Sequence, residues 1–228
     1  MRGRFLLILI LVFPFVLKAQ TLTGTSGLLN IPSADMQADG TFMMGANYLP
    51  KLNQPALGYN TGNFYFNVTF LPFLEVAMKN TLVKVSNGRY LQQDRALNLR
   101  LQLMKEKTYL PAVTLGVNNI YSEHENNNRN HIGSFYFVLT KHFEVDQTII
   151  GLTSGYGFKT FQYNQFVGLF GGLSITPHFF KPLTFMGEYD GKGVNLGGSL
   201  LFFKHFYLLS MVQQLKYFAG GVAYRVHL

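Results

Sequence analysis

The feature that most constrains this chain is a recurring segment of about ten residues in which apolar and polar side chains alternate. Residues 63–70 (NFYFNVTF) and 95–104 (RALNLRLQLM) are clear examples, with apolar side chains at every second position and mostly polar ones between. A period of two predicts β-strands whose two faces meet different surroundings. Beyond the first twenty residues, no run is apolar enough for a membrane-spanning helix, which needs about 20 residues.

The alternating segments recur along most of the chain and predict about twelve strands, an even number. They cover residues 41–48, 63–70, 73–80, 95–104, 112–118, 133–141, 148–155, 166–175, 183–189, 194–203, 207–213 and 217–228. In the first half, long links (residues 49–62, 81–94 and 119–132) alternate with short ones, as in bacterial outer-membrane barrels. Asp190-Gly191 predicts a tight turn, and Ca²⁺ binding by Asp190 and Glu188 is the alternative function of these two carboxylates.

The composition favours a membrane protein over a soluble one. Only 13% of residues are charged, about half the roughly 25% that is typical of soluble domains, and there are 22 Phe, 13 Tyr and 23 Gly. Backbone groups cannot stay unpaired in hydrocarbon, so a sheet that crosses it must close. We therefore predict an all-β fold, a transmembrane antiparallel up-and-down β-barrel at residues 41–228. The alternative is a soluble sheet that buries the same apolar rows.

The N-terminus predicts two further segments. Residues 1–20 have a basic start and an apolar core, which indicates a signal peptide cleaved near Ala19 or Gln20. Without it, 16 basic and 11 acidic residues leave a net charge of +5, unclustered, which argues against nucleic acid. Residues 21–40 precede the first strand and contain Pro32 and several glycines, so we expect a loop. Two placements are consistent with the sequence, inside the lumen as a plug or beneath the barrel.

The last twelve residues, YFAGGVAYRVHL, are among the most regular strands of the chain. We predict that this strand pairs with the first and so closes the barrel. Outer-membrane barrels are assembled from a C-terminal strand of this kind, and we assign that signal to Val222, Tyr224, Val226 and Leu228.

The opposite faces of the strands predict the lumen. We expect these side chains to point inward: Tyr65, Asn67, Glu75, Lys79, Asn98, Arg100, Glu188 and Arg225. We group the charges as Glu75 with Lys79, Arg100 with Glu188, and Arg225 with His227. Such groups fill a small barrel by satisfying one another, or they line a polar path for a sugar chain, and the sequence leaves both interpretations open.

Several stretches resemble the YjbH-like outer-membrane proteins that are linked to exopolysaccharide production. They run in order along the chain: Thr23–Phe42 (TGTSGLLNIPSADMQADGTF), Pro72–Thr81 (PFLEVAMKNT), Asp94–Asn119, Phe170–Gly172 (FGG) and Gly187–Gly197 (GEYDGKGVNLG). The resemblance implies a barrel in the outer membrane of a Gram-negative bacterium, with a role in capsule or exopolysaccharide secretion. Its partners would be outer-membrane lipid, the barrel-assembly machinery, the polysaccharide and its export components.

No catalytic motif stands out. A nucleophile elbow, a zinc-protease motif and a phosphate-binding loop are all missing from the sequence, so we expect no enzyme and no cofactor or metal. His124 and His131 share a polar link with two glutamates, but their spacing fits no standard ligand motif. We place His142, His178 and His205 in periplasmic turns. The leading hypothesis is a non-catalytic barrel that assists polysaccharide export; the alternatives are a small general porin and, more weakly, a barrel enzyme.

Overall fold

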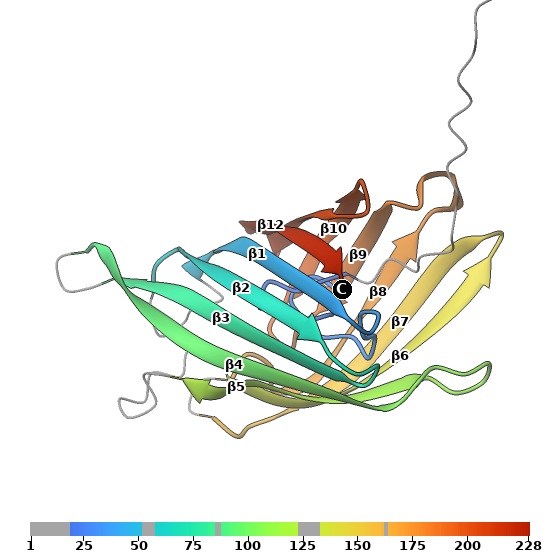
Figure 1. The fold of residues 1–228 in the computed structure, drawn as a ribbon, viewed down its shortest axis with the longest axis horizontal. Helices are drawn as coiled ribbons and strands as arrows, with labels where there is room; N and C mark the ends of the chain where they lie inside the picture. The colour runs from blue at the N-terminus through green and yellow to red at the C-terminus, as the bar shows by residue number, and fades with distance from the viewer. Residues whose placement is uncertain (1–18, 52–57, 85–87, 123–132, 162–163) are drawn as a thin grey trace, which may run out of the picture.

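The computed structural model describes residues 19–51, 58–84, 88–122, 133–161 and 164–228. Twelve antiparallel β-strands form one closed barrel (Figure 1). The strands are β1 Thr41–Leu49, β2 Thr61–Thr69, β3 Leu74–Lys84, β4 Tyr90–Met104, β5 Ala112–Ser122, β6 Ser134–Val145, β7 Thr148–Phe158, β8 Gly168–Thr176, β9 Leu183–Tyr189, β10 Val194–Phe202, β11 Phe206–Gln213 and β12 Tyr217–His227. The predicted fold class and strand number are confirmed.

Each strand pairs with its sequence neighbour, and β12 pairs with β1 to close the sheet. The closing register places Thr41 opposite His227 and Tyr48 opposite Gly220. The predicted pairing of the last strand with the first is therefore confirmed. It leaves no free sheet edge, which is the condition for a β-structure in hydrocarbon.

The two ends of the barrel differ. Short connections such as Asp146-Gln147, between β6 and β7, lie at the same end as residues 40 and 228, and there Leu228 N donates to Gly40 O. We call this the short-turn end. The predicted His124 and His131 link lies outside the described residues. The signal-peptide prediction also lies largely outside the described residues.

Several strands extend beyond their predicted limits. The predicted long link at residues 81–94 is mostly strand, because β3 continues to Lys84 and β4 starts at Tyr90. Strand β6 continues to Val145, so the prediction that His142 lies in a turn is wrong. His178 does lie in a connection, in the 3₁₀ helix η3 (His178–Phe180). Among the described residues, no helix is long and apolar enough to cross a membrane.

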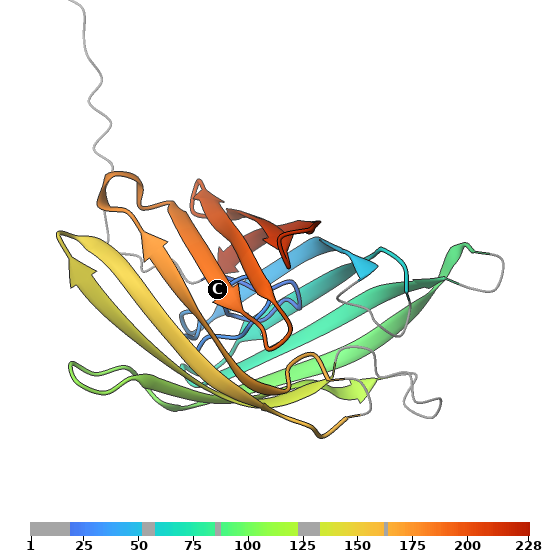
Figure 2. The same ribbon diagram turned by 180° about the vertical axis from the view of Figure 1, so that it is seen from behind.

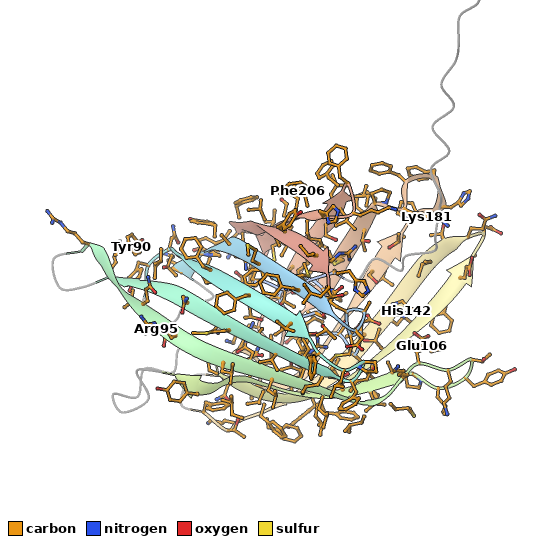
Figure 3. The ribbon with its side chains drawn as sticks, viewed as in Figure 1. Tyr90, Arg95, Glu106, His142, Lys181 and Phe206 are labelled. Carbon is orange, nitrogen blue, oxygen red and sulfur yellow. The ribbon has the colours of Figure 1, made fainter. Side chains whose placement is uncertain are left out.

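The outward face of the wall is apolar, and most of the polar strand side chains point inward. Large apolar side chains are exposed on every strand except β3, where the outward Val76 and Met78 are half-buried. Phe206, for example, is 55% exposed and points away from the barrel (Figure 3). The inward side chains are mostly polar and buried, including Asn98 and Thr114. The lumen therefore holds polar side chains together with a buried apolar cluster that includes Leu29, Met43 and Met211, and a second apolar surface lies outside.

Candidate functional site: the plugged lumen

The N-terminal segment runs inside the barrel. Figures 1 and 2 show it as the blue trace enclosed by the wall from both sides. We call residues 20–38 the plug; all of its residues except Asp35 and Ala38 are buried. Of the two placements that the sequence left open, the structure has the one inside the lumen. A buried loop has few backbone partners of its own, so its polar groups must be satisfied by the wall.

Part of the plug is a compact turn around the sequence GLLNIP. Leu28 N donates to Ile31 O at 3.0 Å, and Leu22 N donates to Leu29 O at 3.1 Å. A side chain at Gly27 would collide with Thr21 and with the Ile31 carbonyl, so the turn requires glycine there. This turn leaves several backbone N–H groups without partners inside the plug.

The carboxylate of Glu188, on β9, accepts three of these N–H groups. Its Oε2 accepts from Leu29 N at 3.0 Å and from Ile31 N at 3.2 Å, and its Oε1 accepts from Asn30 N at 2.8 Å. Asn195 Nδ2 donates to the same Oε1 at 2.9 Å. Hydrogen bonds to a carboxylate are stronger than those between neutral groups, so Glu188 is the main anchor of the turn.

Asp190 holds the side of the turn next to Glu188. Its Oδ2 accepts from Asn30 Nδ2 at 3.0 Å and from Asn195 Nδ2 at 3.1 Å. Its Oδ1 accepts the backbone N–H groups of Lys192 and Gly193, which fixes the predicted tight turn between β9 and β10. Protein donors thus occupy all four carboxylate oxygens of Asp190 and Glu188, the alternative Ca²⁺ site of the sequence. Among the described residues, no group of three His, Asp or Glu side chains is placed to hold a metal.

A second anchor is the buried ion pair between Arg100 on β4 and Glu75 on β3. Arg100 Nη1 donates to Glu75 Oε2 at 2.7 Å, and neither side chain is exposed. Arg100 Nη2 donates to the carbonyls of Ser33 and Asp35, and Ser26 N donates to Glu75 Oε1 at 2.8 Å. The pair therefore binds one N–H group and two carbonyls of the plug. The predicted grouping of Arg100 with Glu188 is wrong: Arg100 pairs with Glu75, and Glu188 binds a different part of the plug.

Side-chain amides on the wall satisfy the plug's carbonyls. Asn47 and Asn63 both donate to Leu22 O, at 2.9 and 2.8 Å. Asn67 donates to Gly24 O at 2.8 Å and Asn98 to Thr23 O at 3.2 Å. Tyr65 adds a hydroxyl bond to Gln20 Oε1 at 2.9 Å. Strands β1, β2 and β4 thus hold the first half of the plug.

The predicted lumen residues fall into two groups. Tyr65, Asn67, Glu75, Asn98, Arg100 and Glu188 all bond directly to the plug. Lys79 is fully buried, and its Nζ has no hydrogen-bond partner among the described residues. Arg225 lies at the short-turn rim and donates to Lys204 O at 3.3 Å. Sequence reasoning missed Asn47, Asn63 and Asn195, whose only signal is an amide at an inward strand position.

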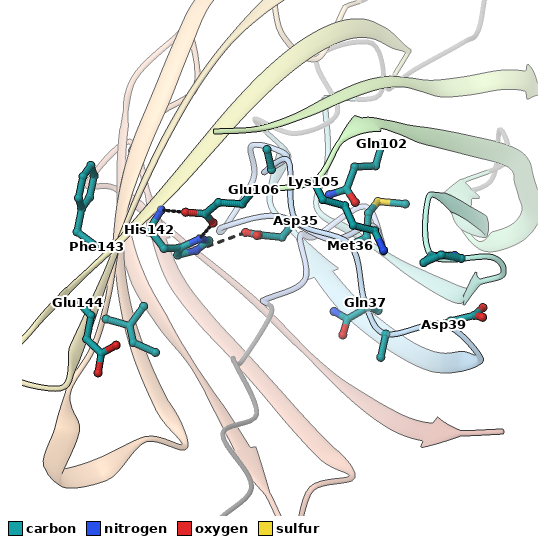
Figure 4. Close-up of a pocket in the computed structure, with 14 residues that line it drawn as sticks. Asp35, Met36, Gln37, Asp39, Gln102, Lys105, Glu106, His142, Phe143 and Glu144 are labelled. Carbon is teal, nitrogen blue, oxygen red and sulfur yellow. Dashed lines mark hydrogen bonds and ion pairs between the residues drawn. The ribbon is translucent and has the colours of Figure 1, made fainter. Parts of the chain in front are cut away.

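A cavity of about 600 Å³ opens at the short-turn end, where the plug runs towards β1 (Figure 4). Its wall carries Glu106, from the β4–β5 connection, and His142, from β6; Figure 3 places both at this end. His142 Nδ1 lies 2.7 Å from Glu106 Oε2, and His142 Nε2 lies 3.7 Å from the plug carboxylate Asp35 Oδ2. Lys141 Nζ also donates to Glu106, at 2.8 Å.

Two opposing effects act on the pKa of Glu106. Partial burial raises it, but hydrogen bonds from Lys141 and from the backbone and ring of His142 outweigh that effect, and the pKa lies below the ordinary value of 4.5. Glu106 is therefore held as a carboxylate that ties the β4–β5 connection to β6. Through His142 this cluster also reaches the plug.

The fold and the site together define a β-barrel with an apolar exterior and a polar lumen filled by its own N-terminal segment. The chain belongs to the YjbH family, described as exopolysaccharide biosynthesis protein YbjH, whose model matches residues 19–167. No curated protein matches the chain. The matched region contains the whole plug, Glu75 and Arg100. Glu188 lies beyond it, in the Gly187–Gly197 stretch of the resemblance.

Proposed function

We propose that this protein is a non-catalytic outer-membrane β-barrel that assists the export or surface assembly of an exopolysaccharide. The family description ties the chain to exopolysaccharide biosynthesis. The exposed apolar side chains suit a hydrocarbon environment, since a soluble monomer seldom exposes apolar surface on this scale. A closed sheet with outward apolar and inward polar side chains is the form in which strands cross an outer membrane.

The plug is the observation that carries the proposal beyond a general barrel. A general porin keeps an aqueous channel, whereas this lumen is occupied by residues 20–38, bonded to the wall through Glu188, Arg100 and seven other side chains named above. A lumen filled in this way does not favour the small-porin alternative. A plugged lumen is consistent with a barrel that is closed in the absence of its partners and that acts on one class of polysaccharide or within one export complex.

Localisation is tested by fractionation of the native host. The protein is expected with the outer-membrane fraction, and it should migrate differently on gels before and after boiling, because closed barrels resist detergent until heated. Recovery in the soluble fraction without detergent would contradict the membrane assignment.

The role itself is tested by deletion of the gene. Surface exopolysaccharide, stained or measured as extracted sugar, is expected to fall and to return with a plasmid-borne wild-type copy. The matched control is a copy with Lys216→Gln, an exposed position in the β11–β12 turn, which should restore the polysaccharide fully. Unchanged surface polysaccharide in the deletion strain would sink the proposal.

A further inference from the structure

The cavity at the short-turn end has the size of a ligand site. Its volume of about 600 Å³ lies within the range of pockets that hold small molecules, roughly 300–1,000 Å³. Its floor is the last part of the plug, and its wall comes from the strand and turn residues around Glu106 and His142. In Figure 4, Asp35, Glu106 and His142 point towards one another at one side of it.

The lining offers two kinds of surface. Polar groups that exchange hydrogen bonds with hydroxyls come from the exposed carboxylates of Asp39 and Glu144 and from Lys105, whereas Gln102 Nε2 already donates to Ala34 O at 2.8 Å. The larger part of the lining is apolar and includes Ala38, Pro72 and Ile149. Sugar rings present hydroxyls at their edges and C–H groups on their faces, so they match such a mixed lining.

Charge narrows the class of sugar. Four carboxylates line the cavity, those of Asp35, Asp39, Glu106 and Glu144, and its basic groups are Lys105 and His142. Glu106 is bonded to Lys141 and His142, and Asp35 lies beside His142. The exposed Asp39 and Glu144 leave the cavity with an excess of negative charge, which repels uronic acids and accepts neutral or amine-bearing sugars.

We propose that this cavity binds a short stretch of an uncharged or amine-bearing glycan as it reaches the short-turn end of the barrel. The inference rests on the proposed function, which it deepens by naming the class of sugar. A bound chain would contact Asp35 directly and so touch both the plug and, through His142, the wall.

The test is saturation-transfer NMR on the purified full-length protein in detergent. Three tetrasaccharide probes are compared: chitotetraose, which is neutral, its deacetylated form, which carries amines, and tetragalacturonate, which is acidic. The neutral and amine-bearing probes are expected to bind, and the acidic probe is not. Ala38→Trp, which fills the cavity from an exposed position, should weaken binding at least tenfold, whereas the matched control Lys216→Trp at the opposite end should not.

A second variant tests the charge argument. Asp39→Asn combined with Glu144→Gln should reduce binding of the amine-bearing probe more than binding of chitotetraose. The inference is overturned if no probe binds, if the acidic probe binds best, or if Ala38→Trp binds as well as wild type. Binding is measured on purified protein, independently of the deletion strain. If no probe binds but the deletion strain still loses surface polysaccharide, only this inference is wrong. Binding without such a defect would instead remove the proposed export role.

Discussion

At the residue scale, the lumen depends on two carboxylates that bind backbone N–H groups of the plug. Glu188 accepts three of them and Glu75 accepts one while it pairs with Arg100. Both carboxylates are buried, so each is tolerable only because donors surround it. Removing a single member therefore leaves partners unsatisfied where no bulk water replaces them.

Glu188→Gln keeps the size of the side chain but replaces one acceptor oxygen by a donor that faces plug N–H groups. We expect the folded barrel to lose about 1–3 kcal/mol, the cost of leaving buried hydrogen-bonding groups unpaired. Urea unfolding followed by the shift in gel mobility measures it. Glu144→Gln, an exposed glutamate, is the matched control and should change stability little. An unchanged midpoint for Glu188→Gln would contradict the anchoring role.

Arg100→Met leaves the Glu75 carboxylate buried without its cation. Breaking a buried ion pair from one side typically costs about 3–5 kcal/mol, so this variant should be among the least stable. The double variant Arg100→Met with Glu75→Leu removes both charges and should recover part of the loss. If the two residues do not interact, the losses in free energy of unfolding from Arg100→Met and Glu75→Leu will simply add in the double variant. That outcome would contradict the ion pair as an anchor.

Glu106 makes the stability of the folded protein depend on pH in the acidic range. Its pKa is lower in the folded protein than the ordinary 4.5, so its contribution is complete above that value and is lost as the pH falls through the folded pKa. Wild type should therefore lose more thermal stability than Glu106→Gln when the pH is lowered from about 6 to about 3. The effect is modest because the side chain is 26% exposed. Equal losses in both proteins would contradict the assignment.

At the element scale, the sequence predicts strands well because period-two alternation records the two environments of the wall. It predicts their ends poorly. At the ends of β3 and β4, from Asn80 to Lys84 and at Tyr90, the backbone pairing continues although the apolar–polar alternation has stopped. The plug has no periodic signal at all, since side chains on distant strands satisfy its backbone. Glu188, for instance, is 159 residues from Leu29.

The absence of native cysteine allows a direct test of where the plug lies. Ser26→Cys places a thiol at a fully buried plug position, and Ala38→Cys places one at an exposed position of the same segment. A membrane-impermeant maleimide should label the second within minutes and the first only after unfolding. Equal labelling of the two in the folded protein would show that the segment does not occupy the lumen.

At the scale of the whole molecule, motifs from distant parts of the sequence meet in one place. The GLLNIP turn, Glu75 of PFLEVAMKNT, Arg100 and Glu188 of GEYDGKG form a single network around the plug. The sequence predicted that most of these side chains face the lumen, because strand parity determines that. The sequence predicted Glu188 as the partner of Arg100, whereas the structure has Glu75. The alternation along a strand determines that a side chain points inward but not which side chain it contacts there.

The measurement that tests the central claim most directly is the conductance of the purified wild-type barrel in a planar lipid bilayer. Insertion is verified in the same preparation by the heat-dependent gel shift of protein recovered from liposomes. A barrel closed by its own N-terminal segment should insert and yet give no long-lived open steps. Stable, frequent open-channel steps from wild-type protein would contradict a plugged lumen and would favour the porin alternative.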